Sequence, residues 1–236
     1  MDKKYFQKVA KQYHLELTDN LLEKFAQFQN MLLSWNQKMN LTAITDEKEI
    51  IDKHFIDSLL LTCVLGETKG KKAVDIGAGA GFPSIPVALY DEKLQWIGLD
   101  SLQKRIGFIN EVIQTLCICN YKAVHERAQE AGQNSHLRET FDYGTARAVA
   151  KLSVLAELGL PLVKKGGSFF ALKGGTPEQE IEDAANAIYL LGGHIQRIHS
   201  FELPDSSRRT IIEIKKIQTT PAKYPRLRVN TAKKPL

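Results

Sequence analysis

The residues with the clearest chemical meaning form a glycine-rich stretch after a short apolar segment. The stretch reads Val74-Asp75-Ile76-Gly77-Ala78-Gly79-Ala80-Gly81-Phe82-Pro83, and a second acidic residue, Asp100, ends the next apolar segment. Alternating glycines let a backbone approach a ligand closely, because glycine lacks a Cβ and adopts positive φ angles. A following helix offers free N–H groups, and Asp100 could accept hydrogen bonds from both hydroxyls of a ribose. Together these residues predict a Rossmann-like nucleoside site.

The spacing of the glycines favours one nucleoside ligand over another. A dinucleotide fingerprint has the pattern G-x-G-x-x-G, whereas here Gly81 comes one residue early and Phe82 takes the place of the last glycine. With Asp75 two residues before Gly77, the stretch resembles the E/D-x-G-x-G-x-G loop of class I S-adenosylmethionine methyltransferases. That cofactor carries a sulfonium and an α-amino group, which Asp75 could favour directly or through water. The alternative is a glycine-rich turn without a ligand.

Two basic residues come directly after later predicted strands, and the carboxyl ends of parallel strands face the ligand crevice. Arg147 follows the predicted strand Tyr143–Thr145, in an apolar segment where an arginine needs an anionic or π partner. It could bind a cofactor carboxylate, an RNA phosphate or a target base, or it could reach out to a surface acid. Lys173, after Ser168–Leu172, could face the crevice or belong to an exposed loop. We expect Arg147 and Lys173 to be the catalytic residues.

The loop Glu126–Glu130 follows another predicted strand, Tyr121–His125. In a methyltransferase such a loop holds adenine through backbone groups and one polar side chain, although a solvated charged turn is the alternative. The cofactor-binding residues expected from the sequence are Asp75, Gly77, Gly79, Gly81, Phe82, Asp100, Ala128, Gln129 and Arg147.

Positive charge accumulates towards the end of the chain. Arg208 and Arg209 lie between the last two predicted strands, and no acid follows Glu213. Prolines within residues 218–236 argue against a regular helix or a packed strand. A tail of like charge often contacts nucleic acid, and a solvated tail is the alternative. The expected RNA-binding residues are Arg208, Arg209, Lys223, Arg226 and Arg228.

The pattern of elements predicts how these residues are positioned. Helical spacing of apolar residues before the glycine loop predicts an N-terminal helical extension over residues 1–65, packed on the body. From residue 66 to residue 217 strands and helices alternate, which indicates parallel βαβ units with right-handed crossovers. The last two strands, Ile195–Phe201 and Thr210–Ile217, have a short link and must be antiparallel. We predict an α/β seven-stranded sheet with an antiparallel last strand, followed by the basic tail 218–236, in one structural domain.

Composition sets limits on the remaining possibilities. The chain has 236 residues, 43% hydrophobic and 25% charged, with a net charge of +5, as in ordinary globular proteins with a weak preference for acidic partners. No apolar run approaches the ~20 residues that span a bilayer, and the N-terminus lacks an apolar signal core. Three cysteines form an odd, sparse set that fits a reducing cytoplasm and predicts no metal site. We expect a monomer in the cytoplasm.

Six motifs, taken in chain order, resemble one family. They are Asn40-Leu41-Thr42-Ala43, His54 with Asp57-Ser58-Leu59, the glycine loop, Asp100-Ser101-x-x-Lys104-Arg105, Ala146-Arg147-Ala148 and Ala171-Leu172-Lys173-Gly174. The set is similar to the bacterial 16S ribosomal RNA guanine-N7 methyltransferase G family, also called glucose-inhibited division protein B. The resemblance implies methyl transfer from S-adenosylmethionine to N7 of one guanine near the decoding centre. It also implies 16S rRNA, the 30S subunit or an assembly intermediate as the partner.

The resemblance also implies roles for individual residues. Gly77 and Phe82 match the cofactor loop of the family, Ala128 and Gln129 match its adenine-side loop, and Arg147 matches its arginine after the fourth strand. The family often has an acid at the position of Gln129, but an amide still donates and accepts hydrogen bonds.

The expected chemistry needs few groups. Guanine N7 has a free lone pair and loses no proton on methylation, so no general base is required. Two other functions stay open: a class I methyltransferase acting on a small molecule or protein, and a non-catalytic module that binds a nucleoside or RNA. His54 and Asp57 lie about one helical turn apart, where they could line the mouth of the site or brace the helix against the sheet.

Overall fold

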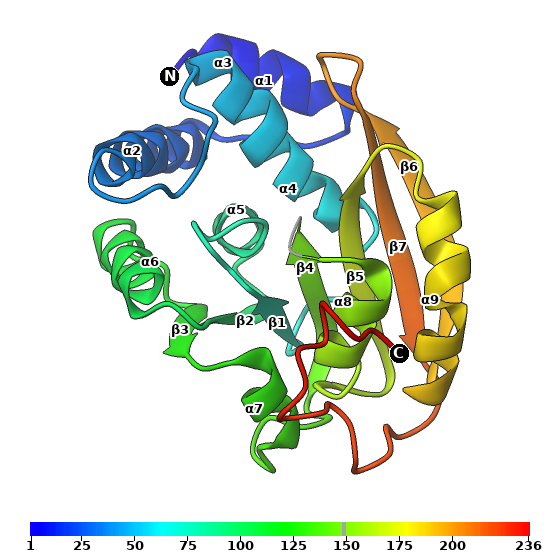
Figure 1. Cartoon of the computed structure of the whole chain (residues 1–236). Coiled ribbons are helices and arrows are strands. Elements are labelled where there is room, and N and C mark those ends of the chain that lie inside the picture. Colours follow the sequence, from blue (N-terminus) through cyan, green and yellow to red (C-terminus); the bar gives the residue numbers. More distant parts are fainter. Residues whose placement is uncertain (148–149) are drawn as a thin grey trace.

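Seven strands form a single sheet within residues 1–147 and 150–236, the part of the chain that the computed structural model describes (Figure 1). The order across the sheet is β3-β2-β1-β4-β5-β7-β6. Strands β1 to β5 run parallel, and β7 lies antiparallel to both β5 and β6. The strands are β1 (Lys72–Ile76), β2 (Gln95–Asp100), β3 (Tyr121–His125), β4 (Phe141–Arg147), β5 (Val163–Gly174), β6 (Gly193–Glu202) and β7 (Arg208–Lys216). The predicted α/β fold with an antiparallel last strand is confirmed.

The strand order determines where a ligand can bind. The chain passes from β1 outwards to β2 and β3, then returns to place β4 on the other side of β1. Strands β1 and β4 therefore flank a topological switch point, where a crevice opens beyond the carboxyl ends of the strands. In the register of the sheet, Asp75 lies beside Gly98 and Thr145, and Arg147 lies beside Leu172. Ala148, the last residue of the Ala146-Arg147-Ala148 motif, lies outside the described residues.

Helices cover both faces of the sheet and enclose two apolar clusters. One face carries α1 (Lys3–Gln12), α2 (Asp19–Asn36), α5 (Ser84–Tyr90) and α6 (Gln103–Thr115), and the other carries α7 (Ala128–Gln133), α8 (Leu152–Gly159) and α9 (Glu178–Leu190). Of the helices in the described part of the chain, none has the length and apolar character to cross a membrane.

The N-terminal helices are present as predicted and pack directly on the glycine loop. Asp2 and Thr18 cap α1 and α2 by accepting hydrogen bonds from backbone N–H groups. Phe28 of α2 lies 5.3 Å from Phe82 between ring centroids, and Phe55 lies 6.2 Å from Phe82. This aromatic contact fixes the position of the helices relative to the end of β1.

A further helical run precedes β1 and changes its pitch along its length. It comprises α3 (Glu47–Ile50), a π-helical turn η1 (Ile51–Ile56), α4 (Asp57–Leu59) and a 3₁₀ turn η2 (Leu60–Cys63). In the π-helical turn the Asp57 N–H donates to the Asp52 carbonyl. Such turns are rare and are frequent at functional sites. Here the turn contains His54, whose role the sequence left open.

The C-terminal tail has no regular helix or strand in its described residues, as predicted, but it is packed against the body. The Arg138 guanidinium donates to the carbonyls of Thr220 and Tyr224, and the Gln133 amide donates to the carbonyl of Pro225. The side chains of Tyr224, Thr220 and Thr231 are buried. In Figure 1 the tail runs along the side of the sheet that carries α7 and α8.

Candidate active site

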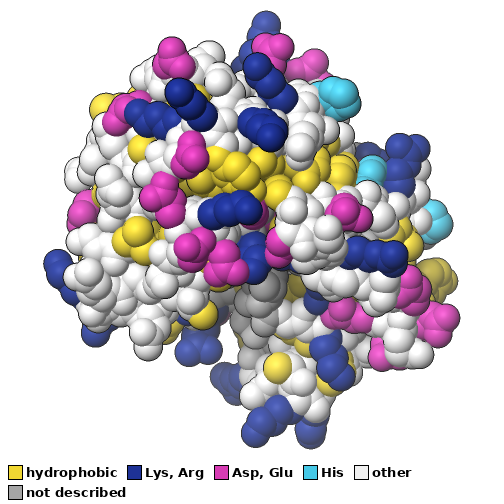
Figure 2. Space-filling model, turned by 90° about the horizontal axis from the view of Figure 1, so that it is seen from above, with side chains coloured by type: hydrophobic (Ala, Val, Ile, Leu, Met, Phe, Trp, Pro, Cys, Tyr) yellow, Lys and Arg dark blue, Asp and Glu magenta, His cyan; other side chains and the backbone are white. Residues whose placement is uncertain are grey.

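A cleft of about 560 Å³ opens at the carboxyl ends of β1, β4 and β5. Its size is within the range of roughly 300–1,000 Å³ found for small-molecule sites. The glycine loop forms one wall, and the segment around Thr42 forms another. Figure 2 looks down on this end of the molecule and shows hydrophobic side chains gathered near the middle, with Lys and Arg side chains close by. The residues that line it are Leu41, Thr42, Ile44, Lys53, His54, Asp57, Gly77, Ala78, Gly79, Ala80, Phe82, Arg105, Arg147, Leu172, Lys173, Gly174 and Arg209.

The three glycines of the loop have different tasks. Gly77 and Gly79 line the cleft with φ angles of 68° and 60°, which only glycine adopts at little cost. A Cβ on Gly81 would lie 2.2 Å from Cδ1 of Ile85, so this glycine allows close packing of the loop on α5. The first two glycines therefore form the backbone that faces the cleft, and the third supports it.

Asp100 lies behind the glycine loop and holds it in place. Its Oδ2 accepts a hydrogen bond from the Gly79 N–H at 2.9 Å, and its Oδ1 accepts one from the Leu102 N–H at 2.9 Å. Arg105 completes the arrangement, with Nη1 at 3.4 Å from Oδ2. The carboxylate is buried and is not part of the cleft lining, so its evident role is to order the loop.

Asp75 lies deeper still, beneath the loop. Its side chain is fully buried and accepts a hydrogen bond from the Ser84 hydroxyl, which also contacts the Tyr121 hydroxyl at 2.7 Å. Burial raises the pKa of Asp75 to about 7. Its Oδ1 is buried without a hydrogen-bond partner in the described structure. The structure therefore places Asp75 below the cleft floor, away from the surface that a ligand would touch directly.

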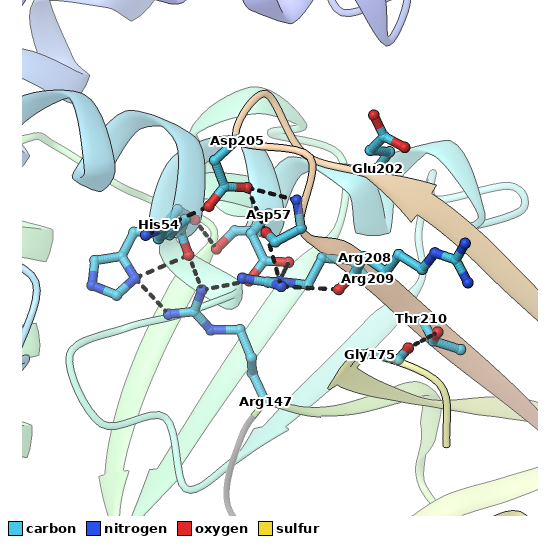
Figure 3. A network of polar contacts seen from close by, with 12 residues as sticks. His54, Asp57, Arg147, Gly175, Glu202, Asp205, Arg208, Arg209 and Thr210 are labelled. Atoms are coloured by element: carbon cyan, nitrogen blue, oxygen red, sulfur yellow. Dashed lines mark hydrogen bonds and ion pairs between the residues drawn. The ribbon is translucent and has the colours of Figure 1, made fainter. Parts of the chain in front are cut away.

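Arg147 lies at the centre of a polar network on the inner wall of the cleft (Figure 3). Its Nη1 donates to Oδ2 of Asp57 at 3.0 Å and to the carbonyl of Lys53 at 3.0 Å. Its Nη2 lies 3.1 Å from Nδ1 of His54, and the guanidinium carbon lies 4.9 Å from the centroid of the Phe82 ring. Asp57 and Phe82 are thus the anionic and π partners that an arginine in an apolar segment needs.

Two basic residues predicted by sequence also line the cleft, and both are paired. The ammonium of Lys173 lies 2.6 Å from Oε1 of Glu180 and donates to the carbonyl of Ala150. Nε of Arg209 lies 3.2 Å from Oδ1 of Asp57. The sequence predicts Arg209 in the link between the last two strands, whereas the structure places it in β7 and in the same network as Arg147.

His54 and Asp57 are the residues of the site whose role the sequence left open. They lie one turn apart, as predicted, and both contact Arg147. Burial, followed by the charge of Arg147, lowers the pKa of His54 to about 3, so the imidazole is neutral near pH 7. Sequence reasoning missed Thr42 as a contact of His54, because only the fold brings their segments together.

The other predicted site residues lie outside the cleft lining. Ala128 and Gln129 begin α7, just after β3. Arg208, Lys223 and Arg228 are exposed. Arg226 is held by Glu157 of α8, with Nη2 at 2.6 Å from Oε2. In the described part of the chain, no group of three or more His, Cys, Asp or Glu side chains is arranged to hold a metal ion.

The fold and the site together define a class I S-adenosylmethionine-dependent methyltransferase: a doubly wound sheet with an antiparallel seventh strand and a glycine loop at the switch point. Solved structures support the fold. A Thermotoga maritima S-adenosylmethionine-dependent O-methyltransferase matches with a TM-score of 0.53 at 12% identity, over 80% of this chain and 73% of its own. An Aquifex aeolicus S-adenosylmethionine-dependent methyltransferase matches with a TM-score of 0.52 at 15% identity, over 77% and 97%.

The chain belongs to the GidB family, described as rRNA small subunit methyltransferase G, whose model matches residues 21–211. A ribosomal RNA small subunit methyltransferase G from Clostridium botulinum (strain Eklund 17B / Type B) is 45% identical over 97% of this chain and 96% of its own length. The resemblance inferred from the six motifs is thereby confirmed.

The residues of the cleft fit the cofactor of this class. The backbone at Gly77 and Gly79 borders the cleft with no side chain to block a ligand. The Phe82 ring offers an apolar face, and the Arg147 guanidinium offers a cation for a carboxylate. A zwitterionic nucleoside such as S-adenosylmethionine presents partners for each of these groups.

Proposed function

We propose that this protein transfers a methyl group from S-adenosylmethionine to N7 of a specific guanine in 16S ribosomal RNA near the decoding centre. The observation that carries the proposal is the cleft at the switch point between β1 and β4, where the glycine loop meets Arg147 in a chain of the GidB family. The acceptor is the bare rRNA, the 30S subunit or an assembly intermediate. We propose that the enzyme acts on this substrate in the cytoplasm, and that it does so as a monomer.

The cleft suits a reaction without proton transfer. When bound, S-adenosylmethionine supplies an electrophilic methyl group, and guanine N7 has a lone pair and releases no proton on methylation. The carboxylate of Asp57 is committed to two arginines, and both imidazole nitrogens of His54 have partners. The task of these residues is therefore to bind and orient, which can itself lower a barrier by several kcal/mol.

Cofactor binding involves both sides of the glycine loop. Gly77, Gly79 and Phe82 contact the cofactor directly, and Arg147 binds its carboxylate. Asp100 and Asp75 act from behind the loop, where Asp100 accepts from the Gly79 N–H. The segment of Ala128 and Gln129, which follows β3, provides the adenine side of the site, and Gly81 supports the loop through its contact with Ile85.

The RNA approaches from the open side of the cleft. Lys173 and Arg209 line the cleft, and Arg208 is exposed on the neighbouring strand β7. The exposed side chains of Lys223 and Arg228 extend the positive surface onto the tail. Arg226 contributes less, because Glu157 neutralises it.

A methyl-transfer assay with labelled S-adenosylmethionine tests the proposal. The acceptors are 30S subunits lacking the modification, bare 16S rRNA and bulk protein, and mass spectrometry identifies the product. We expect label in a single 7-methylguanosine of 16S rRNA. Label in protein or in a small molecule, or no transfer to RNA while the cofactor still binds, would overturn it.

A matched pair of variants connects the assay to the cleft. Gly77→Asp places a carboxylate in the cleft at a positive φ, so cofactor binding by calorimetry and methyl transfer should both be lost. Gly70→Asp introduces the same residue at a φ of 71° with no heavy atom within 4 Å of its Cβ, so activity should be retained. Loss of activity in both variants would mean that the loss in Gly77→Asp does not depend on the cleft.

A further inference from the structure

His54 and Asp57 are buried polar residues. Methyl transfer to N7 releases no proton, so neither residue is needed as a general base. Both lie on the helical run before β1, and both contact Arg147 on β4 (Figure 3). Given the proposed cofactor site, on which this inference rests, we propose that His54 and Asp57 are positioning residues. They hold the Arg147 guanidinium so that its remaining N–H donors bind the carboxylate of S-adenosylmethionine.

The hydrogen bonds of Arg147 leave one part of its guanidinium available. The group has five N–H donors. Nη1 gives two of them to Asp57 and to the Lys53 carbonyl, and Nη2 gives one to His54. Within residues 1–147 and 150–236, the Nε–H and the second Nη2–H have no partner. Two such donors on one planar group match the two oxygens of a carboxylate.

The plane of the guanidinium is fixed from several directions. The Phe82 ring lies under it, with 4.9 Å from the guanidinium carbon to the ring centroid. The His54 ring is stacked on the same Phe82 ring, with centroids 4.6 Å apart and an angle of 20° between the planes. Asp57 and His54 hold two of its nitrogens, so Arg147 cannot rotate without breaking one of these contacts.

In the proposed network His54 takes the tautomer that serves Arg147. Nδ1 lies 3.1 Å from Nη2 of Arg147 and 3.2 Å from the Lys53 carbonyl, so a proton on Nδ1 would go to that carbonyl and leave Arg147 without an acceptor. The ring proton therefore lies on Nε2, which donates to the Thr42 hydroxyl at 2.8 Å. The same hydroxyl oxygen accepts from the Ile44 N–H. This contact connects the Asn40–Ala43 motif, which the proposed reaction did not otherwise use, to the arginine.

Burial and the neighbouring arginine keep His54 in its neutral form. Arg147 and Arg209 carry two positive charges, Asp57 carries one negative charge between them, and the Lys53 ammonium is paired with Glu49 and Asp205. Burial and Arg147 hold the pKa of His54 at about 3. A protonated His54 would lose its acceptor and would repel the arginine.

Two amide substitutions distinguish the roles of the two ring nitrogens of His54. In His54→Asn the side-chain oxygen can take the position of Nδ1 and accept from Arg147, whereas in His54→Gln the amide reaches the position of Nε2 and leaves Arg147 without an acceptor. By calorimetry we expect His54→Gln to bind S-adenosylmethionine about tenfold more weakly and His54→Asn to lose about threefold or less, as for one charge-assisted hydrogen bond. Equal losses in both variants would overturn the proposal.

A probe without a carboxylate identifies the group that Arg147 binds. 5′-Methylthioadenosine retains the nucleoside but lacks the amino-acid end. Its affinity should be the same in the wild type, in His54→Gln and in Asp57→Asn, while the affinity of S-adenosylmethionine falls in both variants. If both ligands weaken together, the two residues maintain the cleft as a whole and the proposal fails.

A double-mutant cycle tests whether the two residues act through Arg147. In an Arg147→Lys background, His54→Gln should cause no further loss of affinity, because the group it orients is already gone. Additive losses would show an independent role. The imidazole ¹⁵N spectrum of the unmodified protein gives a result that needs no variant: a proton on Nε2 supports the network, and a proton on Nδ1 contradicts it.

These measurements need no RNA, so their outcome is separate from that of the methyl-transfer assay. Binding of S-adenosylmethionine without transfer to 16S rRNA would end the proposed function and leave the positioning roles standing. Transfer to 16S rRNA with unchanged cofactor affinity in His54→Gln would end the positioning roles and leave the function standing.

Discussion

Asp57 and Glu157 are buried carboxylates that each hold an arginine, and they use it differently. Asp57, on the run of helix before β1, binds Arg147 and Arg209 from two strands and lines the cleft. Glu157, on α8 over the other face of the sheet, binds Arg226 of the tail. Its Oε1 accepts from both the main-chain N–H and the Nε–H of Arg226. The pairs have the same chemistry, but one faces a cavity and the other fastens a chain segment.

The surroundings of each arginine account for the difference. Arg226 gives its Nη2 to Glu157 and to the Lys234 carbonyl, both within the fold. Arg147 keeps donors available beside a cleft of about 560 Å³. An acid–arginine pair therefore indicates a ligand site only where the arginine also borders a cavity. The sign of the charge and its place in the sequence do not decide this.

The largest effect is expected at the fastening pair. Glu157→Gln removes the charge that Arg226 requires, and breaking such a buried pair typically costs about 3 kcal/mol in the free energy of unfolding. Urea unfolding measures the loss, and calorimetry well below the transition should show unchanged affinity for S-adenosylmethionine. The exposed Glu182→Gln on α9 is the matched control and should change stability by less than about 0.5 kcal/mol. Equal stability of the two variants would show that Glu157 does not fasten the tail.

A buried acid without an arginine provides the next contrast. Asp75 has its pKa raised from 3.8 to about 7 by burial. The unfolded chain releases this proton near pH 4 and the native protein only near pH 7, so Asp75 lowers stability progressively across that interval. Asp75→Asn removes the titration. The stability of Asp75→Asn relative to the wild type should therefore rise by about 3 kcal/mol between pH 5 and pH 8.

Urea unfolding of both proteins at the two pH values measures this difference. Ser84→Ala serves as the reference, because it removes the hydroxyl that donates to Asp75 and leaves the carboxyl in place. A difference between wild type and Asp75→Asn that is constant with pH would mean that Asp75 is already ionised in the native protein at pH 5.

The smallest effect on stability is expected at the exposed cations of the tail. Replacement of Lys223 and Arg228 by Gln should change the free energy of unfolding by less than about 0.5 kcal/mol. If both contact phosphates, the slope of log affinity for 16S rRNA against log salt should fall by about 1 for each. A salt titration of RNA binding measures the slope, and the same substitutions at Lys4 and Lys8 of α1 are the control. An unchanged slope would mean that Lys223 and Arg228 do not contact the RNA.

Local signals in the sequence were sufficient for the fold and for part of the site. Glycine spacing located the loop, and the short link between β6 and β7 required their antiparallel pairing. The position of Arg147 after a predicted strand indicated that it borders the crevice, because the carboxyl ends of parallel strands meet there. Helical spacing placed His54 and Asp57 together.

Contacts between distant segments could not be read from the sequence. Asp57 and Arg147 are 90 positions apart, and the joint contact of Asp57 with Arg209 requires β7 to pack beside β5. The burial of Asp75 and the contact of Gly81 with Ile85 depend on how α5 lies on the loop. The tail reads as a run of positive charge, and only its contacts with Glu157, Arg138 and Gln133 in the fold show that it is anchored.

The anchored tail also has a consequence for how the protein is made. A chain leaves the ribosome N-terminus first, so α8 and the end of β7 emerge before the segment that covers them. Until that segment arrives, Lys216 lacks the Thr220 hydroxyl and Glu157 lacks Arg226. These two contacts therefore form only after residues 220 and 226 have emerged. A chain cut after residue 217 would keep the cleft sequence intact but would leave the buried carboxylate of Glu157 without its arginine.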